Sequence, residues 1–411
     1  MKGLLMIAFH FPPFAGSSGL QRTLRFVQHL PSLGWQPIVL SAHPRAYDQV
    51  TDDLMREVPP GVVVKRAFAL DAARHLSMFR RYPAFLARPD RWLAWRWGAV
   101  PAAMQLVRRY RPAAVWSTYP IATAHLIGAA VRARTGLPWI ADFRDPMAQD
   151  GYPADPRTWQ SFKAIEEQAL RSAARSVFTT PGAARVYRER YPDVPADRVA
   201  VIENGYDEAT FADVPRGAGP LDPGKVTLLH SGIIYPSERD PTQLFQALRR
   251  LLDAGRVSPA TLSIRLRAAV HEGFLRRLIG EYALGGFVTL APPIPYRQAI
   301  VEMMGADGLL VMQASNCNEQ IPAKIYEYVR ARRPILALTD PAGDTAGVLR
   351  EAGLDSICRL DSVDEIAERL PRFVEQVRAG TAPLPSAEFA KRASRLERSR
   401  ALAGLLEQVT G

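Results

Sequence analysis

The sequence predicts an α/β protein made of two Rossmann-like, doubly wound domains. Three observations support this prediction. The 411 residues exceed the roughly 250–300 residues that a single hydrophobic core can organise. Short strand-like runs alternate with helical periodicity along the chain. The alternation is interrupted by a stretch rich in proline and glycine and then starts again, which is typical of two separate domains.

The first series of elements occupies about half of the chain. Some of its runs, such as residues 4–7, are apolar at successive positions, as expected for parallel strands covered on both faces. We expect strands at residues 3–9, 37–42, 61–65, 113–117, 138–142, 176–179 and 199–202, and helices at 20–33, 99–110, 121–135 and 156–174.

The second series follows residues 211–225, where prolines and glycines are frequent enough to predict a linker. We expect strands at residues 226–231, 262–266, 287–290, 307–312, 334–338 and 356–359, and helices at 240–254, 271–283, 322–331 and 361–379. The predicted domains are therefore 1–210 and 226–385. An arginine-rich helical tail follows, and it can pack on either domain.

The charge and the cysteine content of the chain limit which partners and which structural sites are expected. The formal net charge is +11, and almost all of the 52 basic residues are arginines. This excess reflects either a GC-rich genome or a partner that carries phosphates, which arginine binds through two hydrogen bonds. Two cysteines exclude a disulfide scaffold and a cysteine-based zinc site. With so few cysteines, a reducing cytoplasm is the expected compartment. No apolar run reaches the roughly 18–20 residues of a transmembrane helix.

The loop after the first predicted strand is a candidate anion site. Gly16, Ser17, Ser18 and Gly19 precede a helix, whose N-terminal N–H groups attract anions. A flexible turn between strand and helix explains the same residues equally well. The glycine spacing does not match a dinucleotide fingerprint, and no acidic residue ends the second strand. An NAD-dependent dehydrogenase is therefore not expected.

A polar cluster follows the strand predicted at 138–142. Asp142, Arg144 and Asp145 stand where a parallel sheet presents its ligand-binding edge. We expect Asp142 to face a cleft and to be fixed by a forked pair with Arg144, with Asp145 either beside it or capping the turn. The alternatives are a structural salt-bridge corner and, with less support, a metal site.

The second domain carries a more specific pattern. Gly232 ends its first strand, and Arg239 follows shortly after. Pro322 suits the first turn of the next helix, where Lys324 and Glu327 share one face. A cation beside a helix N-terminus is suited to a diphosphate, and a carboxylate one turn later is suited to the two hydroxyls of a ribose. A solvated Lys–Glu pair is the alternative.

Taken together, these motifs resemble retaining GT-B glycosyltransferases of family 4, the bacterial enzymes that build polysaccharides and lipid-linked glycans. The resemblance covers essentially the whole chain. It rests on the proline–glycine loop at 12–19, on Asp-Phe-Arg-Asp-Pro at 142–146, on Asn-Gly-Tyr-Asp at 204–207 and on residues 321–337. It implies two domains that face a central cleft, with the tail at 386–411 completing the first.

The resemblance also implies roles for individual residues. Glu319 and Glu327 take the positions of the family's paired glutamates, near the donor sugar and on the ribose. Arg239 and Lys324 match the basic residues that neutralise the donor diphosphate, in place of a metal, and no cofactor is implied. The sequence departs from the family at Asp142, where a histidine is common, and it retains only Arg239 of a usual basic pair. The expected reaction transfers a sugar from a nucleotide-diphosphate sugar to the hydroxyl of a glycan or lipid-linked acceptor.

Residues 78–97 interleave aromatic side chains with arginines. This mixture is typical of a helix that meets anionic lipid head groups, and it also occurs in proteins that bind single-stranded nucleic acid. A helix that buries its tryptophans is the alternative. Peripheral contact with the inner face of the membrane and the helix with buried tryptophans are supported equally. We expect no nucleic acid, because no recognised nucleic-acid module is present. Two other functions stay open: a sugar-nucleotide epimerase on the same fold, and a non-catalytic binder of nucleic acid or scaffold partners.

Overall fold

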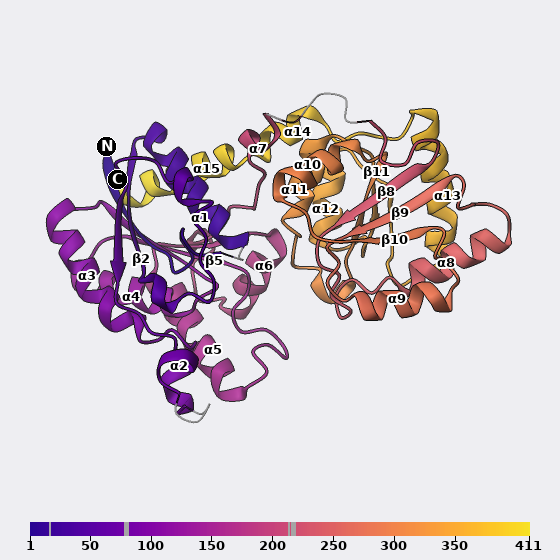
Figure 1. The fold of residues 1–411 in the computed structure, drawn as a ribbon. Helices are drawn as coiled ribbons and strands as arrows, with labels where there is room; N and C mark the ends of the chain where they lie inside the picture. The colour runs from indigo at the N-terminus through magenta and orange to yellow at the C-terminus, as the bar shows by residue number, and fades with distance from the viewer. Residues whose placement is uncertain (16–17, 78–81, 213, 215–218) are drawn as a thin grey trace. The chain divides into compact units, whose positions relative to one another are not determined.

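The computed structural model describes residues 1–15, 18–77, 82–212, 214 and 219–411 (Figure 1). The chain divides into two compact units. The first is Met1–Asn204 together with Arg395–Gly411, and the second is Gly205–Ser394. Each unit contains one parallel sheet flanked by helices, so the predicted α/β class with two doubly wound sheets is confirmed.

The first unit is built on a sheet with strand order β3-β2-β1-β4-β5-β6-β7 in its described part. The strands are β1 Lys2–Ile7, β2 Trp35–Ala42, β3 Val63–Ala67, β4 Ala114–Thr118, β5 Trp139–Arg144, β6 Arg175–Phe178 and β7 Val199–Val201. The helices are α1 Ser18–His29, α2 Ala72–His75, α3 Trp95–Tyr110, α4 Thr123–Thr135, α5 Pro156–Ser172, α6 Pro181–Arg190 and, from the tail, α15 Arg395–Thr410. The order reverses between β1 and β4, where a ligand is expected to bind.

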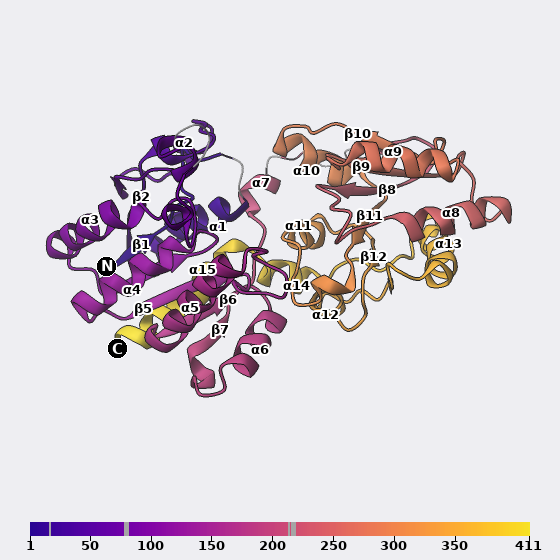
Figure 2. The same ribbon diagram turned by 90° about the horizontal axis from the view of Figure 1, so that it is seen from below.

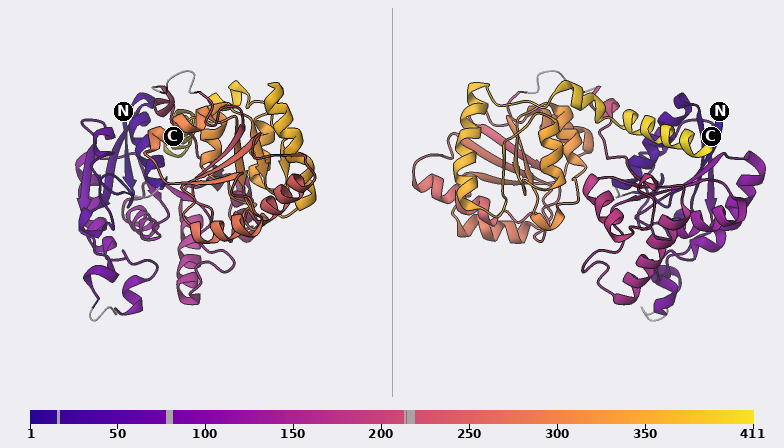
Figure 3. Two further views of the ribbon diagram at one scale, coloured as in Figure 1. Left: turned by 45° about the vertical axis from the view of Figure 1, so that its right-hand side comes forward. Right: turned by 180° about the vertical axis from the view of Figure 1, so that it is seen from behind.

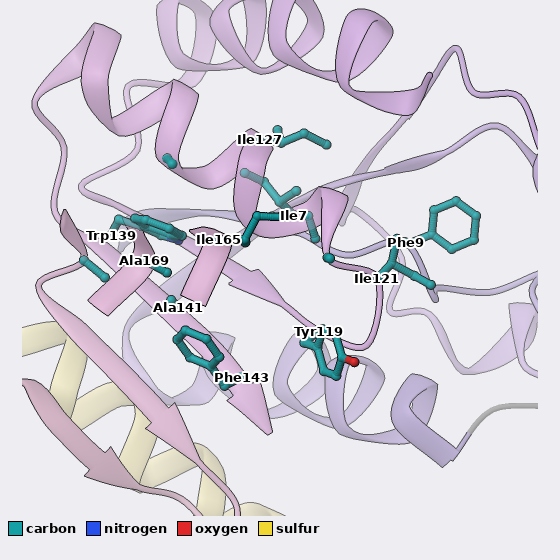
Figure 4. Packing of buried hydrophobic residues seen from close by; sticks show 14 of the residues in the cluster. Ile7, Phe9, Tyr119, Ile121, Ile127, Trp139, Ala141, Phe143, Ile165 and Ala169 are labelled. Atoms are coloured by element: carbon teal, nitrogen blue, oxygen red, sulfur yellow. The ribbon is translucent and has the colours of Figure 1, made fainter. Parts of the chain in front are cut away.

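Alternate residues of β1 are buried in two separate hydrophobic cores. Leu4 and Met6 are buried in a cluster that includes apolar residues of α1 and α15. Leu5 and Ile7 are buried in the opposite cluster with residues of α3, α4 and α5 (Figure 4). Because successive side chains of a strand point to opposite faces, the apolar run at residues 4–7 is explained by helices on both sides of the sheet.

The second unit has strand order β10-β9-β8-β11-β12-β13 in its described part, and Figure 2 shows most of these strands side by side. The strands are β8 Val226–Ser231, β9 Leu262–Arg267, β10 Val288–Ala291, β11 Gly308–Met312, β12 Ile335–Leu338 and β13 Ile357–Cys358. The helices are α7 Glu208–Ala212, α8 Thr242–Asp253, α9 Glu272–Glu281, α10 Tyr296–Gly305, α11 Lys324–Ala331, α12 Asp344–Glu351, α13 Val363–Ala379 and α14 Ala387–Arg392. Leu228 packs toward α8 and α13, whereas Leu229 packs toward α11, so this sheet too is covered on both faces.

The expected tail segment, 386–411, divides between the two units. Phe389 and Ala390 of α14 are buried in a core of the second unit. Helix α15, yellow in Figure 3, packs against α1 in the first unit. Arg398 of α15 pairs with the carboxylate of Glu203 and also donates to the Asn204 carbonyl, 3.1 Å away. These contacts join the tail to the end of the first unit's main segment.

Two differences from the expected elements have local causes. The helix expected at 20–33 ends as an α-helix at His29, and Pro31 lies in the 3₁₀ turn that follows. The strand expected to end at 142 continues to Arg144. In the described part of the chain, no helix is both long enough and apolar enough to cross a membrane.

Candidate functional site

The second unit brings the predicted donor residues to one edge of its sheet. Strands β8 and β11 are parallel neighbours, and the strand order reverses between them. Gly232 follows β8, and Lys324 opens α11 after β11. Because both segments leave the sheet at its carboxyl edge, residues 92 positions apart in sequence meet there.

Lys324 is held in contact with this edge. Its Nζ lies 3.0 Å from Nε2 of His230. Gly232 has a φ of +120°, and a Cβ added to it would lie 3.1 Å from the same Nζ. A residue other than glycine would thus be strained in its backbone and crowded against the ammonium. The close approach of Lys324 to the β8 turn depends on Gly232.

The charge of Lys324 is poorly stabilised by its surroundings. Burial and the nearby positive charge of Arg239 lower the pKa of Lys324 to about 7, against an opposing effect of Glu327. Lys324 is also the first residue of α11, where the helix dipole disfavours a cation. An anion placed here would relieve all of these effects together.

Arg239 is the second cation of the site. Its Nη1 donates to the Ile233 carbonyl at 2.8 Å, and its guanidinium lies over the ring of Tyr235, 5.4 Å from the centroid. Its Nε is buried and has no hydrogen-bond partner among the described residues. The Glu238 carboxylate approaches Arg239 only to 3.7 Å. Arg239 is therefore fixed in direction while part of its hydrogen-bonding capacity is unused.

Glu327 lies one turn after Lys324 on the same face of α11, as predicted. Its carboxylate accepts a hydrogen bond of 2.5 Å from the hydroxyl of Tyr296, the first residue of α10. The Tyr296 ring is 53% exposed. A polar acceptor and an exposed aromatic ring thus stand together beside the two cations, a combination suited to a nucleoside.

Glu319 and Pro322 lie in the loop between β11 and α11. Gln313 is buried beneath this loop, and its side-chain amide donates to the carbonyls of Cys317 and Gln320 at 2.9 and 3.0 Å. Glu319 is half-buried beside them. The helix begins at Lys324, so the prediction that Pro322 occupies its first turn is wrong by two residues. The Pro322 carbonyl instead accepts a turn hydrogen bond from Ile325.

The first unit corrects the expectation for Asp142. Its side chain is fully buried and lies in a fork of Arg22, with both oxygens 3.0 Å from guanidinium nitrogens. Thr118 donates a further hydrogen bond at 3.1 Å. The expected fork with Arg144 is therefore wrong. Because β5 runs on to Arg144, Asp142 is an interior residue of the sheet and not a strand end.

Arg144 instead lies against the start of α1. It has a positive φ of +63°, at a register shift between β5 and β6. Its Nη1 is 3.3 Å from the Tyr119 carbonyl, and a Cβ on Gly19 would overlap the same nitrogen at 2.0 Å. Asp145 is exposed. Of the other loop candidates, Ser18 begins α1, whereas Gly16 and Ser17 lie outside the described residues.

The loop after β1 adds a group that the sequence did not single out. His10 stacks on Phe14 with ring centroids 4.2 Å apart, and its Nδ1 is buried with no partner in the described part of the chain. Burial and the charge of Arg144 lower the pKa of His10 to about 3. His10 is thus a neutral hydrogen-bonding group beside Arg144. His230, Tyr296 and Arg22 were also missed, because their roles depend on contacts distant in sequence.

In the described part of the aromatic and basic segment, residues 82–97, some aromatic side chains are buried and others are exposed. Trp95 is fully buried, and Trp92 packs on Phe9 with ring centroids 5.0 Å apart. Phe85 and Trp97 are 67% and 63% exposed. The tryptophan-burying alternative thus holds for part of the segment, while two large apolar side chains remain on the surface.

A comparison with family models finds a similarity in the first unit. Residues 19–205 match the model of the glycosyl transferase 4-like domain. This stretch contains strands β2 to β7 of the first sheet, together with Arg22, Asp142 and Arg144. None of the curated proteins matches the sequence.

Solved structures share the fold of the whole chain. HepE from Anabaena, solved with UDP, covers 99% of this chain and 100% of its own, with 14% identity and a TM-score of 0.69. Sucrose-phosphate synthase from Thermosynechococcus elongatus covers 100% and 96%, with 14% identity and a TM-score of 0.64. A UDP-forming α,α-trehalose-phosphate synthase from Burkholderia xenovorans covers 98% and 99%, with 12% identity and a TM-score of 0.65. These neighbours confirm the GT-B fold predicted from the resemblance. The family-model match over residues 19–205 indicates a glycosyltransferase.

Proposed function

We propose that this protein is a retaining, metal-independent glycosyltransferase that uses a UDP-sugar donor. The proposed acceptor is a hydroxyl group of a glycan or a lipid-linked glycan. The observation that carries the proposal is the Lys324 ammonium, which lies against Gly232 beside Arg239 at the switch point of the second sheet. Two cations with unsatisfied demand for an anion are what a nucleotide diphosphate requires.

We assign each part of the donor, the diphosphate, the ribose and the sugar, to residues at the carboxyl edge of the second sheet. Lys324 and Arg239 bind the diphosphate oxygens, with the N-terminal N–H groups of α11 as further donors. Glu327 accepts the ribose hydroxyls, in exchange for or beside the Tyr296 hydroxyl. Glu319, in the loop that precedes α11, is assigned to the transferred sugar. UDP is the proposed nucleotide because HepE has been solved with UDP and with UDP-glucose.

The chemical contribution of these residues is electrostatic. When the bond between the sugar and the diphosphate breaks, negative charge grows on the leaving phosphate. Lys324 and Arg239 stabilise that charge without reorganisation, because their positions are fixed before the reaction. Two cations at this place supply the charge that a divalent metal would otherwise provide, which supports metal independence. Retention rests on the family resemblance.

The first unit is proposed to present the acceptor. Arg144, which lies against the start of α1, and His10 offer hydrogen-bonding groups at the carboxyl edge of the first sheet. Asp142 is not part of this proposal, since its charge is already neutralised by Arg22. Exposed Phe85 and Trp97 support peripheral contact with a membrane that carries a lipid-linked acceptor.

A thermal-shift panel tests the donor assignment. The protein is heated with UDP, GDP, ADP, their sugar conjugates and the corresponding nucleoside monophosphates. We expect UDP and at least one UDP-sugar to raise the melting temperature by several degrees and UMP to raise it less, because ligand binding stabilises the folded state and the diphosphate is the main anchor. Failure of every nucleoside diphosphate to stabilise the protein would contradict the proposal. Conversion of a UDP-sugar to its epimer without any acceptor would support the epimerase instead.

A further inference from the structure

His230 is a buried histidine behind the candidate diphosphate site, and the proposed function assigns it no role. It is 1% exposed and lies near the end of β8. Its Nδ1 is 3.0 Å from the carbonyl oxygen of Leu310 on the neighbouring strand β11, and its Nε2 is 3.0 Å from Nζ of Lys324. Both ring nitrogens therefore have a partner, one structural and one in the site.

These two contacts fix the protonation state of the imidazole. A carbonyl oxygen only accepts hydrogen bonds, so Nδ1 must carry a proton. An ammonium only donates, so Nε2 must be the acceptor and unprotonated. In agreement, burial and the charges of Lys324 and Arg239 lower the pKa of His230 well below its ordinary value. His230 is thus a neutral acceptor that points at the ammonium.

We propose that His230 is a positioning residue for the diphosphate site, an inference that rests on the proposed function: its Nε2 holds the Lys324 ammonium against Gly232. Lysine has a flexible four-carbon stem and three N–H donors. With one donor directed at His230, the ammonium is fixed at the β8 turn and its other donors are free to meet phosphate oxygens. Without this acceptor, the stem would have to be ordered by the ligand itself, at a cost in affinity.

The arrangement also couples nucleotide binding to proton uptake. The charged and titratable groups that face Lys324 are His230 from β8, Arg239 from the segment before α8 and Glu327 on α11. Burial and the charge of Arg239 lower the pKa of Lys324 to about 7, so part of the free protein carries a neutral Lys324 at pH 8. A bound diphosphate raises that pKa by its negative charge, so binding at pH 8 takes up protons. UDP adds little uptake of its own, because its terminal phosphate, with a pKa of about 6, is already ionised at this pH.

Two substitutions separate the roles of the two ring nitrogens. In His230→Gln, the amide oxygen reaches the position of Nε2 and can still accept from Lys324. In His230→Asn, the shorter amide occupies the position of Nδ1, so it keeps the bond to Leu310 and loses Lys324. We expect UDP affinity, measured by calorimetry on the full-length protein at pH 8, to stay within about threefold in His230→Gln and to fall about tenfold in His230→Asn. A purely structural role predicts the reverse order, with affinity following the melting temperature.

Proton uptake provides a second measurement that needs no variant. Titrations of the wild-type protein with UDP in two buffers of different ionisation enthalpy should show uptake at pH 8 and less at pH 6. Absence of uptake at pH 8 would show that Lys324 is already charged in the free protein and would contradict the coupling. Equal UDP affinity in both His230 variants and the wild type would overturn the positioning role. The proposed function fails separately: it is contradicted if the wild type does not bind UDP at all. Binding that is lost in Lys324→Ala but unchanged in both His230 variants would contradict the positioning role alone.

Discussion

Glu327 is the residue to which we assign the ribose of a bound nucleotide, and its carboxylate already accepts a hydrogen bond from Tyr296. Glu327→Gln keeps the shape of the side chain and removes the charge. Because hydrogen bonds to a charged acceptor are stronger than those to a neutral one, UDP affinity should fall about tenfold in calorimetric titrations. The matched control is Glu351→Gln, at an exposed position of α12, which should bind UDP as the wild type does. Unchanged UDP affinity in Glu327→Gln would contradict the ribose assignment.

The buried pair of Asp142 and Arg22 contributes to the stability of the first unit. Asp142→Asn leaves the guanidinium of Arg22 buried without a charged partner, which should lower the free energy of unfolding by about 3–5 kcal/mol. Denaturant titration measures this change. Asp145→Asn, at an exposed carboxylate of the same loop, should stay within about 0.5 kcal/mol. If Asp142→Asn kept wild-type stability and lost turnover, Asp142 would be a catalytic residue after all.

The turn between β8 and α8 links backbone conformation to the site. Gly232 has a positive φ and lies against Lys324, whereas Gly255 has a positive φ of +64° with open space around it. Alanine at either position should cost roughly 1 kcal/mol in unfolding free energy, because both backbones favour glycine. Only Gly232→Ala should also weaken UDP binding, since its methyl group would displace the ammonium. Equal UDP affinity in the two variants would show that Lys324 does not depend on this turn.

The elements that the sequence predicted best are those whose pattern is local. The strand expected at 226–231 is β8 with the same bounds, because its apolar residues lie in one short run shortly before the turn at Gly232. The contact between His230 and Lys324 could not be predicted in this way. This contact requires that β8 and β11 pair in the sheet, which no local periodicity encodes. It also requires the imidazole tautomer that the Leu310 carbonyl selects.

The error at Asp142 has a similar origin. Its residue type and its place near a strand end suggested a cleft. Two further residues of β5 and a register shift against β6 decide instead that Asp142 faces Arg22 and that Arg144 turns toward Gly19. Bulges of this kind re-aim side chains by one position, and their location depends on strand pairing. The sequence therefore placed these polar residues near the end of β5 but assigned the wrong partner to Asp142.

At the scale of the whole molecule, the proposal requires no metal. Lys324 and Arg239 supply the positive charge at the donor site. Transfer from the UDP-sugar identified in the panel should therefore continue in excess EDTA at close to the untreated rate. A rate that collapses in EDTA and returns with magnesium or manganese would refute metal independence while leaving the fold assignment intact.

The most direct test of the account concerns the contact between Lys324 and the terminal phosphate of the donor nucleotide. Affinities for UDP and UMP are measured by calorimetry in the wild type, in Lys324→Ala and in the control Lys391→Ala, which alters an exposed lysine of α14. We predict that the wild type and the control bind UDP at least about tenfold more tightly than UMP, as expected for a charge-assisted hydrogen bond. In Lys324→Ala this preference should fall about fivefold, because the ammonium that meets the second phosphate is gone while Arg239 remains. A preference for UDP that is the same in Lys324→Ala as in the wild type would contradict the central claim.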